Sequence, residues 1–287
     1  MNVKKIFCLI MILFFSFTGM YYGGKVFIYE KESLLQQSSF NDLLNTASID
    51  DDSEGDSTNG LSNGLSKFKA SIFWSSILGN QHEQKKQKSS NYVNIPSSSE
   101  VCRLHAKNPD IVGWIKVTNT RINYPVMQTK SEPYFYLHHD LNRKTSNYGV
   151  PCLGENTDLS KPSDNLIIYG HHMRNGTMFA DLEEYKNKDF FKQNRYIYFN
   201  TIEGDGKYEV VAGYKTTVGS GNDEFKYYNF VDASSKEEFD AYVAKSKGKA
   251  LYDTGVTASY GDKLITLSTC EYSAANGRMV VLAKKVE

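Results

Sequence analysis

The sequence has no excess of either charge, because 33 lysine and arginine residues balance 33 aspartate and glutamate residues. A protein that binds nucleic acid usually presents a strongly basic face, so this balance argues against a nucleic-acid partner. Cysteine is also scarce, and none of the four cysteines stands in a CxxC pair. The sequence therefore argues against a zinc ribbon and against a thioredoxin-like redox pair.

The four cysteines are Cys8, Cys102, Cys152 and Cys270. Cys8 lies in an apolar N-terminal run, which leaves three, so at least one thiol stays free even if the other two pair. A disulfide between Cys102 and Cys152 is one alternative, and three unpaired, mostly buried thiols is the other. No spacing of cysteine, histidine and carboxylate residues matches a known metal pattern, so we expect no metal site.

Long hydrophobic runs are nearly absent, and the exception extends from Ile6 to about Tyr22 after Lys4 and Lys5. Such a run is at the short end for a membrane-spanning helix, and it also fits the apolar core of a secretory signal. No small-residue cleavage site follows, so we favour an uncleaved single-pass membrane anchor over residues 1–30, with the lysines in the cytoplasm. A cleaved signal is the alternative, and both interpretations place the working domain outside the cytoplasm.

Residues 31–97 are mostly polar, and much of the segment is rich in Ser, Asn, Asp and Gly. Such a segment buries too little apolar surface to offset the entropy lost on ordering, so we interpret it as a flexible tether. The folded domain is expected over residues 98–287. It begins with a helix through Lys107, which Ser98 and Ser99 can cap and which Asn108-Pro109 ends.

Short runs rich in Val, Ile, Tyr and Thr predict eight strands in this domain. They cover residues 112–117, 121–128, 147–153, 165–170, 195–200, 206–217, 263–270 and 278–285. Two helices are predicted between them, at 178–193 and 234–247. In the second, Ser234 or Ser235 caps the first turn, and acidic residues come early and lysines late, as the helix dipole favours. Eight short strands with few helices predict a mainly β fold, a closed or nearly closed barrel.

The last two predicted strands hold the most informative residues. Cys270 ends one strand and Arg278 begins the next, with the turn signal Asn276-Gly277 between them. If the strands pair antiparallel, backbone geometry alone holds the thiol and the guanidinium close together. A nearby cation favours the nucleophilic thiolate, and a fixed guanidinium can stabilise the oxyanion of an acyl transfer. Taken singly, Cys270 could be a buried thiol and Arg278 a solvated charge at a strand end. Their position together at one hairpin favours a catalytic role.

A thiol nucleophile of this kind needs a proton shuttle, and the chain contains six histidines. His171 follows the predicted strand 165–170, where a rigid strand gives way to a loop, and we favour it as the general acid and base. His138 and His139, followed by Asp140, form the rival site. Neighbouring residues of an extended chain point to opposite faces, so neither His-His pair is expected to bind one metal ion.

Several segments resemble the sortase family, and class B in particular. Residues 266–270, Thr-Leu-Ser-Thr-Cys, resemble the TLxTC motif, and residues 169–173, Tyr-Gly-His-His-Met, resemble the class B histidine motif. Arg278, followed by Met-Val-Val, resembles the catalytic arginine and the last strand. Further similar segments are 108–115, 122–126, 178–179 and 214–217. The resemblance covers about residues 98–287, and the segment before it matches nothing in the family.

The resemblance implies an eight-stranded sortase β-barrel with an N-terminal helix and a helix between strands six and seven. It implies a cysteine transpeptidase in which Cys270 attacks the Thr carbonyl of a C-terminal sorting signal and forms a thioester. His171 would act as general acid and then as base, and Arg278 would hold the substrate and the oxyanion. By similarity, the residues that line the substrate groove are Tyr169, Leu137, Ser268 and Glu271.

The partners implied are secreted proteins with a sorting motif and an amine of a peptidoglycan precursor, so that surface proteins become anchored to the wall of a Gram-positive cell. No metal and no organic cofactor is implied. A secreted cysteine hydrolase with the same triad remains an alternative, as does a non-enzymatic, membrane-anchored β-barrel that binds a partner and does not need Cys270. A pilus-polymerising sortase usually carries a lid with an Asp-Pro motif, and no Asp-Pro precedes the predicted barrel.

Overall fold

The computed structural model describes residues 3–49, 95–129, 131–161, 163–219 and 225–287. Apart from Ile49, these residues belong to one compact unit. Residues 50–94, which make up most of the predicted tether, lie outside the described residues.

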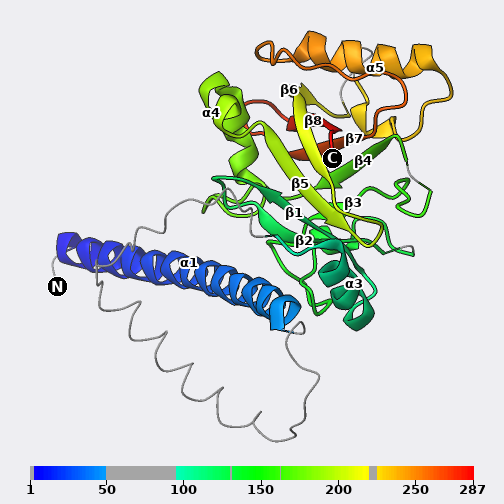
Figure 1. Ribbon diagram of the computed structural model, residues 1–287. Coiled ribbons are helices and arrows are strands. Elements are labelled where there is room, and N and C mark those ends of the chain that lie inside the picture. The colour runs from blue at the N-terminus through cyan, green and yellow to red at the C-terminus, as the bar shows by residue number, and fades with distance from the viewer. Residues whose placement is uncertain (1–2, 50–94, 130, 162, 220–224) are drawn as a thin grey trace, which may run out of the picture. The chain divides into compact units, whose positions relative to one another are not determined.

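The described residues form eight strands that close into a barrel in the order β1-β2-β3-β4-β7-β8-β6-β5 (Figure 1). Neighbouring strands are antiparallel, except that β2 pairs with β3, and β4 with β7, in parallel. The predicted mainly β barrel is therefore confirmed. The strands are β1 Ile111–Val117, β2 Asn123–Met127, β3 Cys152–Leu153, β4 Asn165–Tyr169, β5 Tyr196–Thr201, β6 Lys207–Thr217, β7 Leu264–Cys270 and β8 Gly277–Lys285.

The third strand is much shorter than the predicted 147–153. Residues before it form a loop in which the Ser146 hydroxyl accepts hydrogen bonds from the amides of Tyr148 and Gly149. Gly149 has φ +57°, and a Cβ there would lie 2.3 Å from the carbonyl oxygen of Leu137. A loop packed this tightly against the 3₁₀ helix η1 (Phe135–Leu137) leaves only two residues to pair as β3.

The helices around the barrel agree in part with the sequence. The opening helix α3 (Ser98–Lys107) and the helix between strands six and seven, α5 (Lys236–Lys249), are confirmed. Ser97, rather than Ser98 or Ser99, caps α3, and Ser235 caps α5. The predicted helix 178–193 is instead a 3₁₀ helix followed by a short α-helix, because the Asn187 side chain caps the second one. The remaining short helices are η1 Phe135–Leu137, η2 Ala180–Lys186, α4 Lys188–Gln193 and η3 Tyr227–Asn229.

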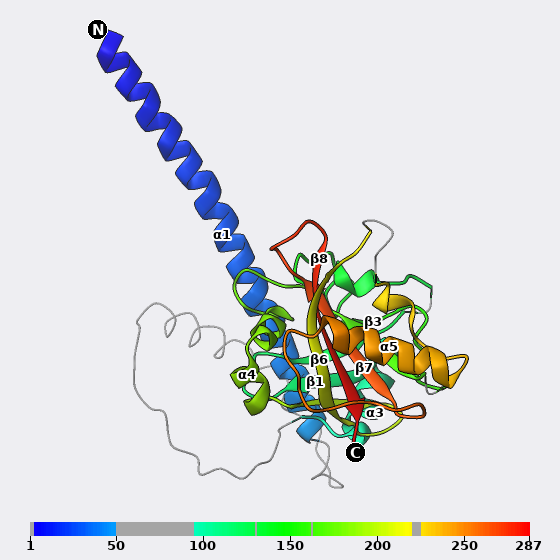
Figure 2. The same ribbon diagram turned by 90° about the horizontal axis from the view of Figure 1, so that it is seen from above.

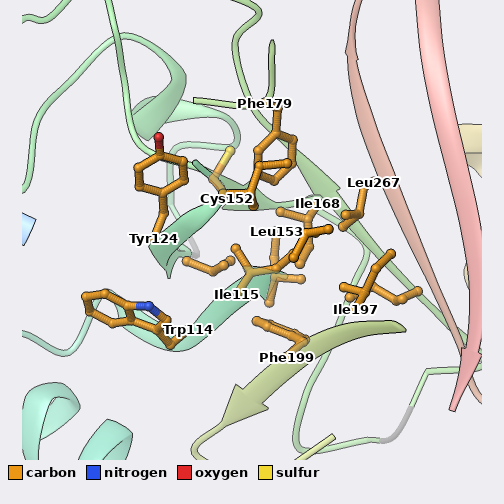
Figure 3. Packing of buried hydrophobic residues seen from close by; sticks show 14 of the residues in the cluster. Trp114, Ile115, Tyr124, Cys152, Leu153, Ile168, Phe179, Ile197, Phe199 and Leu267 are labelled. Carbon is orange, nitrogen blue, oxygen red and sulfur yellow. The ribbon is translucent and has the colours of Figure 1, made fainter. Parts of the chain in front are cut away.

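Side chains of the central strands alternate between two apolar clusters. Along β8, Met279, Val281 and Ala283 belong to the cluster inside the barrel, whereas Val280 and Leu282 belong to a second cluster with α5. Figure 2 shows α5 lying over β6, β7 and β8, and Figure 3 shows the side chains that meet in the first cluster. Because alternate residues of a strand point to opposite faces, Cys270 and Arg278 are expected on the outer face, in phase with Val280.

The N-terminal helix α1 (Val3–Ile49) runs through the predicted boundary between the anchor and the tether. Its second half packs against the barrel: Phe40 is buried, its ring centroid lies 5.4 Å from that of Tyr124, and the Glu32 carboxylate accepts a hydrogen bond from Ser146. Residues 31–49 are thus helical and packed rather than a flexible tether. Within the part of the chain that the structure describes, no helix combines the length and the apolar character needed to cross a bilayer.

The interior cluster gives a prediction about stability. Leu267 is fully buried inside the barrel, so Leu267→Ala should lower the free energy of unfolding by about 2–5 kcal/mol, because it removes apolar contacts and leaves a cavity. Denaturant unfolding followed by fluorescence measures this change. Leu251 is 45% exposed, and Leu251→Ala should stay within about 0.5 kcal/mol of the parent. Equal effects of the two substitutions would contradict the assignment of Leu267 to the core.

Candidate active site

A cavity of about 500 Å³ opens beside the ends of β4, β7 and β8. The three residues predicted to carry the chemistry, Cys270, His171 and Arg278, all line it. Tyrosines and other residues from η1, η3 and the end of β6 complete its walls. The remaining lining residues are Tyr134, Leu137, His138, Tyr169, Gly170, Val218, Gly219, Tyr227, Tyr228, Ser268 and Thr269.

Strand register brings the thiol and the two other groups to the same place. Cys270 pairs directly with Arg278 across the β7–β8 hairpin. On the other side, β4 runs parallel to β7 with Tyr169 opposite Ser268. His171 lies two residues after Tyr169, and Cys270 lies two residues after Ser268. The parallel register therefore places His171 opposite Cys270. Residues that lie 99 positions apart in sequence are thus neighbours through one parallel strand pair.

Cys270 differs from the other described cysteines in its surroundings. All three are free, so there is no Cys102–Cys152 disulfide, and Cys270 is partly exposed at the cavity. Cys152 is buried in the barrel, and burial raises the pKa of its thiol to about 12. Cys102 is exposed on α3, away from the cavity. Of these thiols, only Cys270 lines the cavity together with His171 and Arg278.

His171 is held in one orientation by the chain before it. Its Nε2 atom lies 2.6 Å from the carbonyl oxygen of Leu137, and a carbonyl oxygen only accepts, so Nε2 carries the proton. Nδ1 is then the nitrogen left to exchange protons in the cavity. Burial lowers the pKa of His171 below its usual value, the Leu137 carbonyl opposes this, and nearby His138 lowers it further. The neutral imidazole is therefore favoured near pH 7.

The other histidines of the two His-His pairs take different positions. His138 lines the same cavity, with its ring centroid 5.8 Å from that of His171. His139 instead stacks on Phe135, at 3.7 Å between ring centroids. His172 turns to the backbone, where its Nδ1 lies 3.0 Å from the carbonyl oxygen of Cys270. Among the described residues, no three His, Cys, Asp or Glu side chains gather as a metal site would require.

Three of the four residues predicted to line a substrate groove line this cavity. Tyr169, Leu137 and Ser268 are among the lining residues, and the Ser268 hydroxyl lies 2.6 Å from that of Tyr227. The ring centroid of Tyr169 lies 5.4 Å from that of Tyr134, edge to face. Burial raises the pKa of Tyr227 to about 12 and raises that of Tyr169 as well. These phenols therefore stay neutral and present a largely aromatic surface to the cavity.

Glu271 is the exception among the predicted groove residues, because it does not line the cavity. Its side chain is only 4% exposed and lies 3.0 Å from the ammonium groups of both Lys186 and Lys215. Burial alone would raise the pKa of this carboxyl, but hydrogen bonds from Ser273 and the two lysines lower it to about 2. Glu271 is thus a permanently charged group that faces lysines of η2 and β6.

Sequence reasoning missed three tyrosines of the cavity wall, Tyr134, Tyr227 and Tyr228. They lie beside η1 or on η3, short segments with no periodic pattern to place them. Tyr134 even adopts a left-handed backbone conformation, with φ 61°, which is uncommon for a bulky residue. The only signal available was the abundance of tyrosine, and abundance does not assign a position.

Comparisons with known proteins find relatives of one family. A family model described as "Sortase domain" matches residues 115–286. Sortase B of Staphylococcus aureus is 34% identical over 186 residues, which cover 64% of this chain and 73% of the relative. Sortase B of Listeria monocytogenes is 34% identical over 196 residues, which cover 68% of this chain and 77% of the relative.

A solved structure of similar architecture is a Staphylococcus aureus sortase B–substrate complex. It aligns with a TM-score of 0.64 and 26% identity, and the alignment covers 90% of this chain and 99% of the other.

Proposed function

Because this chain belongs to class B of the sortase family, we propose that Cys270 is the nucleophile with which it cleaves a C-terminal sorting signal. Membership of the family makes the protein a cysteine transpeptidase that anchors or processes surface proteins. The assignment of individual roles rests on one observation: Cys270, His171 and Arg278 line a single cavity.

The first half of the proposed reaction forms an acyl-enzyme. The Cys270 sulfur attacks the carbonyl carbon of the signal's threonine while its proton passes to Nδ1 of His171. Arg278 donates hydrogen bonds to the oxyanion that develops on the carbonyl oxygen. The C–N bond then breaks, the leaving amine takes the proton from His171, and a thioester remains on Cys270.

The second half transfers the acyl group to an incoming amine. His171, neutral again, accepts a proton from that amine as the nitrogen attacks the thioester. The C–S bond breaks, and the proton returns to the sulfur of Cys270. A new amide forms, and the enzyme regains its starting protonation state. We propose an amine of a peptidoglycan precursor as the acceptor, so that the product is a protein anchored to the cell wall.

The groove supports a peptide substrate. One similar solved structure is described as a sortase B–substrate complex, and in this chain Tyr169, Leu137 and Ser268 line the cavity beside Cys270. We propose that these residues contact the sorting signal. The same proposal places the domain outside the cytoplasm, as the Lys4-Lys5 pair and the apolar run after it suggest.

A peptide assay separates the proposal from its nearest alternative. The full chain is incubated with sorting-motif peptides, with and without a glycine-rich or diamino acceptor, and the products are identified by mass spectrometry. A transpeptidase forms a new amide adduct when the acceptor is present. A hydrolase gives only the free acid with every acceptor, and that outcome would overturn the transfer step.

Removal of the guanidinium is expected to slow the reaction strongly. Arg278→Ala should lower kcat/KM roughly 10²–10³-fold, because a fixed donor to the oxyanion is lost. Arg278→Lys keeps the charge but loses the planar fork, and it should recover only part of the rate. Steady-state assays with one peptide and one acceptor measure both variants. The matched control is Arg195→Ala, since Arg195 pairs with Glu209 between β5 and β6 and does not line the cavity.

A rate for Arg278→Ala within a few-fold of the parent would show that another group stabilises the oxyanion.

A further inference from the structure

A cluster of alternating charges lies next to the catalytic hairpin without lining the cavity. Its centre is Glu271, the residue after Cys270, with Lys186 of η2 and Lys215 of β6 each 3.0 Å from one carboxylate oxygen. Ser273 donates to the other oxygen through its backbone N–H, at 3.0 Å, and through its hydroxyl, at 2.6 Å. Every oxygen of this buried carboxylate therefore has a partner, as burial of a charge requires.

The cluster connects η2, β6 and the β7–β8 hairpin. Lys186 also pairs with Glu183 within η2. Glu183 in turn lies 3.9 Å from Nδ1 of His172, the atom that contacts the carbonyl oxygen of Cys270. The cluster is thus connected to the backbone of Cys270 in two ways. Glu271 is the next residue in the sequence, and His172, in the loop after β4, contacts the carbonyl oxygen of Cys270.

Its position also bears on Arg278. The backbone N–H of Glu271 donates to the carbonyl oxygen of Gly277, at 2.9 Å, which closes the hairpin loop. That same oxygen accepts a hydrogen bond from the Arg278 guanidinium, also at 2.9 Å. On the next strand, Lys215 pairs in register with Met279, the neighbour of Arg278. The cluster therefore fixes the loop whose two ends carry the thiol and the guanidinium.

We propose that Glu271, held by Lys186 and Lys215, is a positioning residue that keeps Cys270 and Arg278 in register from outside the cavity and does not touch the substrate. This inference rests on the proposed function. A carboxylate bound by two lysines and Ser273 has no free oxygen to offer a peptide. The charged carboxylate between η2 and β6 instead connects the hairpin to these two elements.

Kinetics of a charge-removing variant test the proposal. Glu271→Gln keeps the shape and removes the charge, and it should lower kcat roughly 10–100-fold while KM stays within about twofold, because misplaced groups slow chemistry more than binding. The loss should be the same for sorting peptides of different sequence. A residue that contacted substrate would instead change KM and the ranking of the peptides, and that result would overturn the proposal.

Matched variants separate this role from a general loss of stability. Glu209→Gln removes a carboxylate that pairs with Arg195 on the same barrel and should leave kcat unchanged. Lys215→Met should lower kcat like Glu271→Gln, and the double variant should lose little more than either single one, because the two residues act as a unit. Fully additive losses would mean that Glu271 acts independently of Lys215.

Hydrogen exchange of the hairpin gives a readout that does not need turnover. In Glu271→Gln, amides of residues 270–278 should exchange at least several-fold faster than in the parent, and those of β1 and β5 should not change. Unchanged exchange in the hairpin would overturn the proposal even if the parent enzyme transferred no peptide at all. Absence of turnover in the parent would count only against the proposed function.

Discussion

Replacement of Cys270 by alanine is expected to abolish transfer of a sorting peptide, with a loss of roughly 10⁴-fold or more, because the group proposed to carry the acyl intermediate is removed. The measurement is mass spectrometry of the enzyme after incubation with a peptide but no acceptor. The parent should gain the mass of the acyl fragment on the tryptic peptide that contains Cys270. The variant should gain nothing.

The other thiols of the described structure cannot replace it. Cys152 is buried inside the barrel with its pKa raised to about 12, so neither access nor ionisation favours attack. Cys102 is exposed, but it lies on α3 and its sulfur contacts the carbonyl oxygen of Ile202 rather than His171 or Arg278. Cys102→Ser is therefore the matched control and should keep the parent rate.

Transfer that persists in Cys270→Ala, or acylation found on Cys102, would reject Cys270 as the nucleophile. A parent protein that gains no acyl fragment and forms no transfer product would instead favour the interpretation of the domain as a binding module. Loss of transfer in Cys102→Ser as well would point to a folding defect, which circular dichroism and the melting temperature would reveal.

The sequence predicts the catalytic hairpin better than the rest of the site, because the hairpin is local. Cys270 and Arg278 are joined by a short loop with an Asn-Gly turn, and the observed register pairs them directly. Strand alternation also bears on Glu271, since a residue next to Cys270 in sequence tends to face the other side. The resemblance assigned Glu271 to the groove, whereas its contacts are with two lysines.

Long-range placement is harder to read from a sequence. His171 reaches the thiol because β4 runs parallel to β7, and no local pattern reveals which strands pair in parallel. Its place at the end of a predicted strand and the motif resemblance both pointed to His171, but neither showed that β4 pairs with β7. Residues 31–49 were expected to be a tether on composition, but Phe40 and Ala47 bury their side chains, which stabilises helix there. Leu43 and Leu44 pack against the same cluster. A few apolar residues in a mostly polar segment are a weak signal for packing when only composition is considered.

The pH dependence of the reaction follows from the environment of His171. His171→Ala should lower kcat/KM roughly 10²–10⁴-fold, the contribution expected of a positioned acid and base. In the parent, the imidazole must be neutral to accept the thiol proton, so activity should fall as the pH drops through the pKa of His171. Burial and His138 lower that pKa from 6.5, and the acid limb of the kcat/KM profile should therefore lie below pH 6.5.

A substitution of His138 should shift the acid limb of the kcat/KM profile while His171 itself is unchanged. The ring of His138 lies 5.8 Å from His171, and a second positive charge there disfavours protonation of His171. His138→Gln removes this repulsion, so the pKa of His171 should rise and the acid limb should shift to higher pH. His105→Gln, on α3 and hydrogen-bonded to the carbonyl oxygen of Ile111, is the control and should leave the profile in place. A shift to lower pH in His138→Gln, or an acid limb of the parent above pH 6.5, would mean that another group controls the protonation step, because both the burial of His171 and the charge of His138 act in the opposite direction.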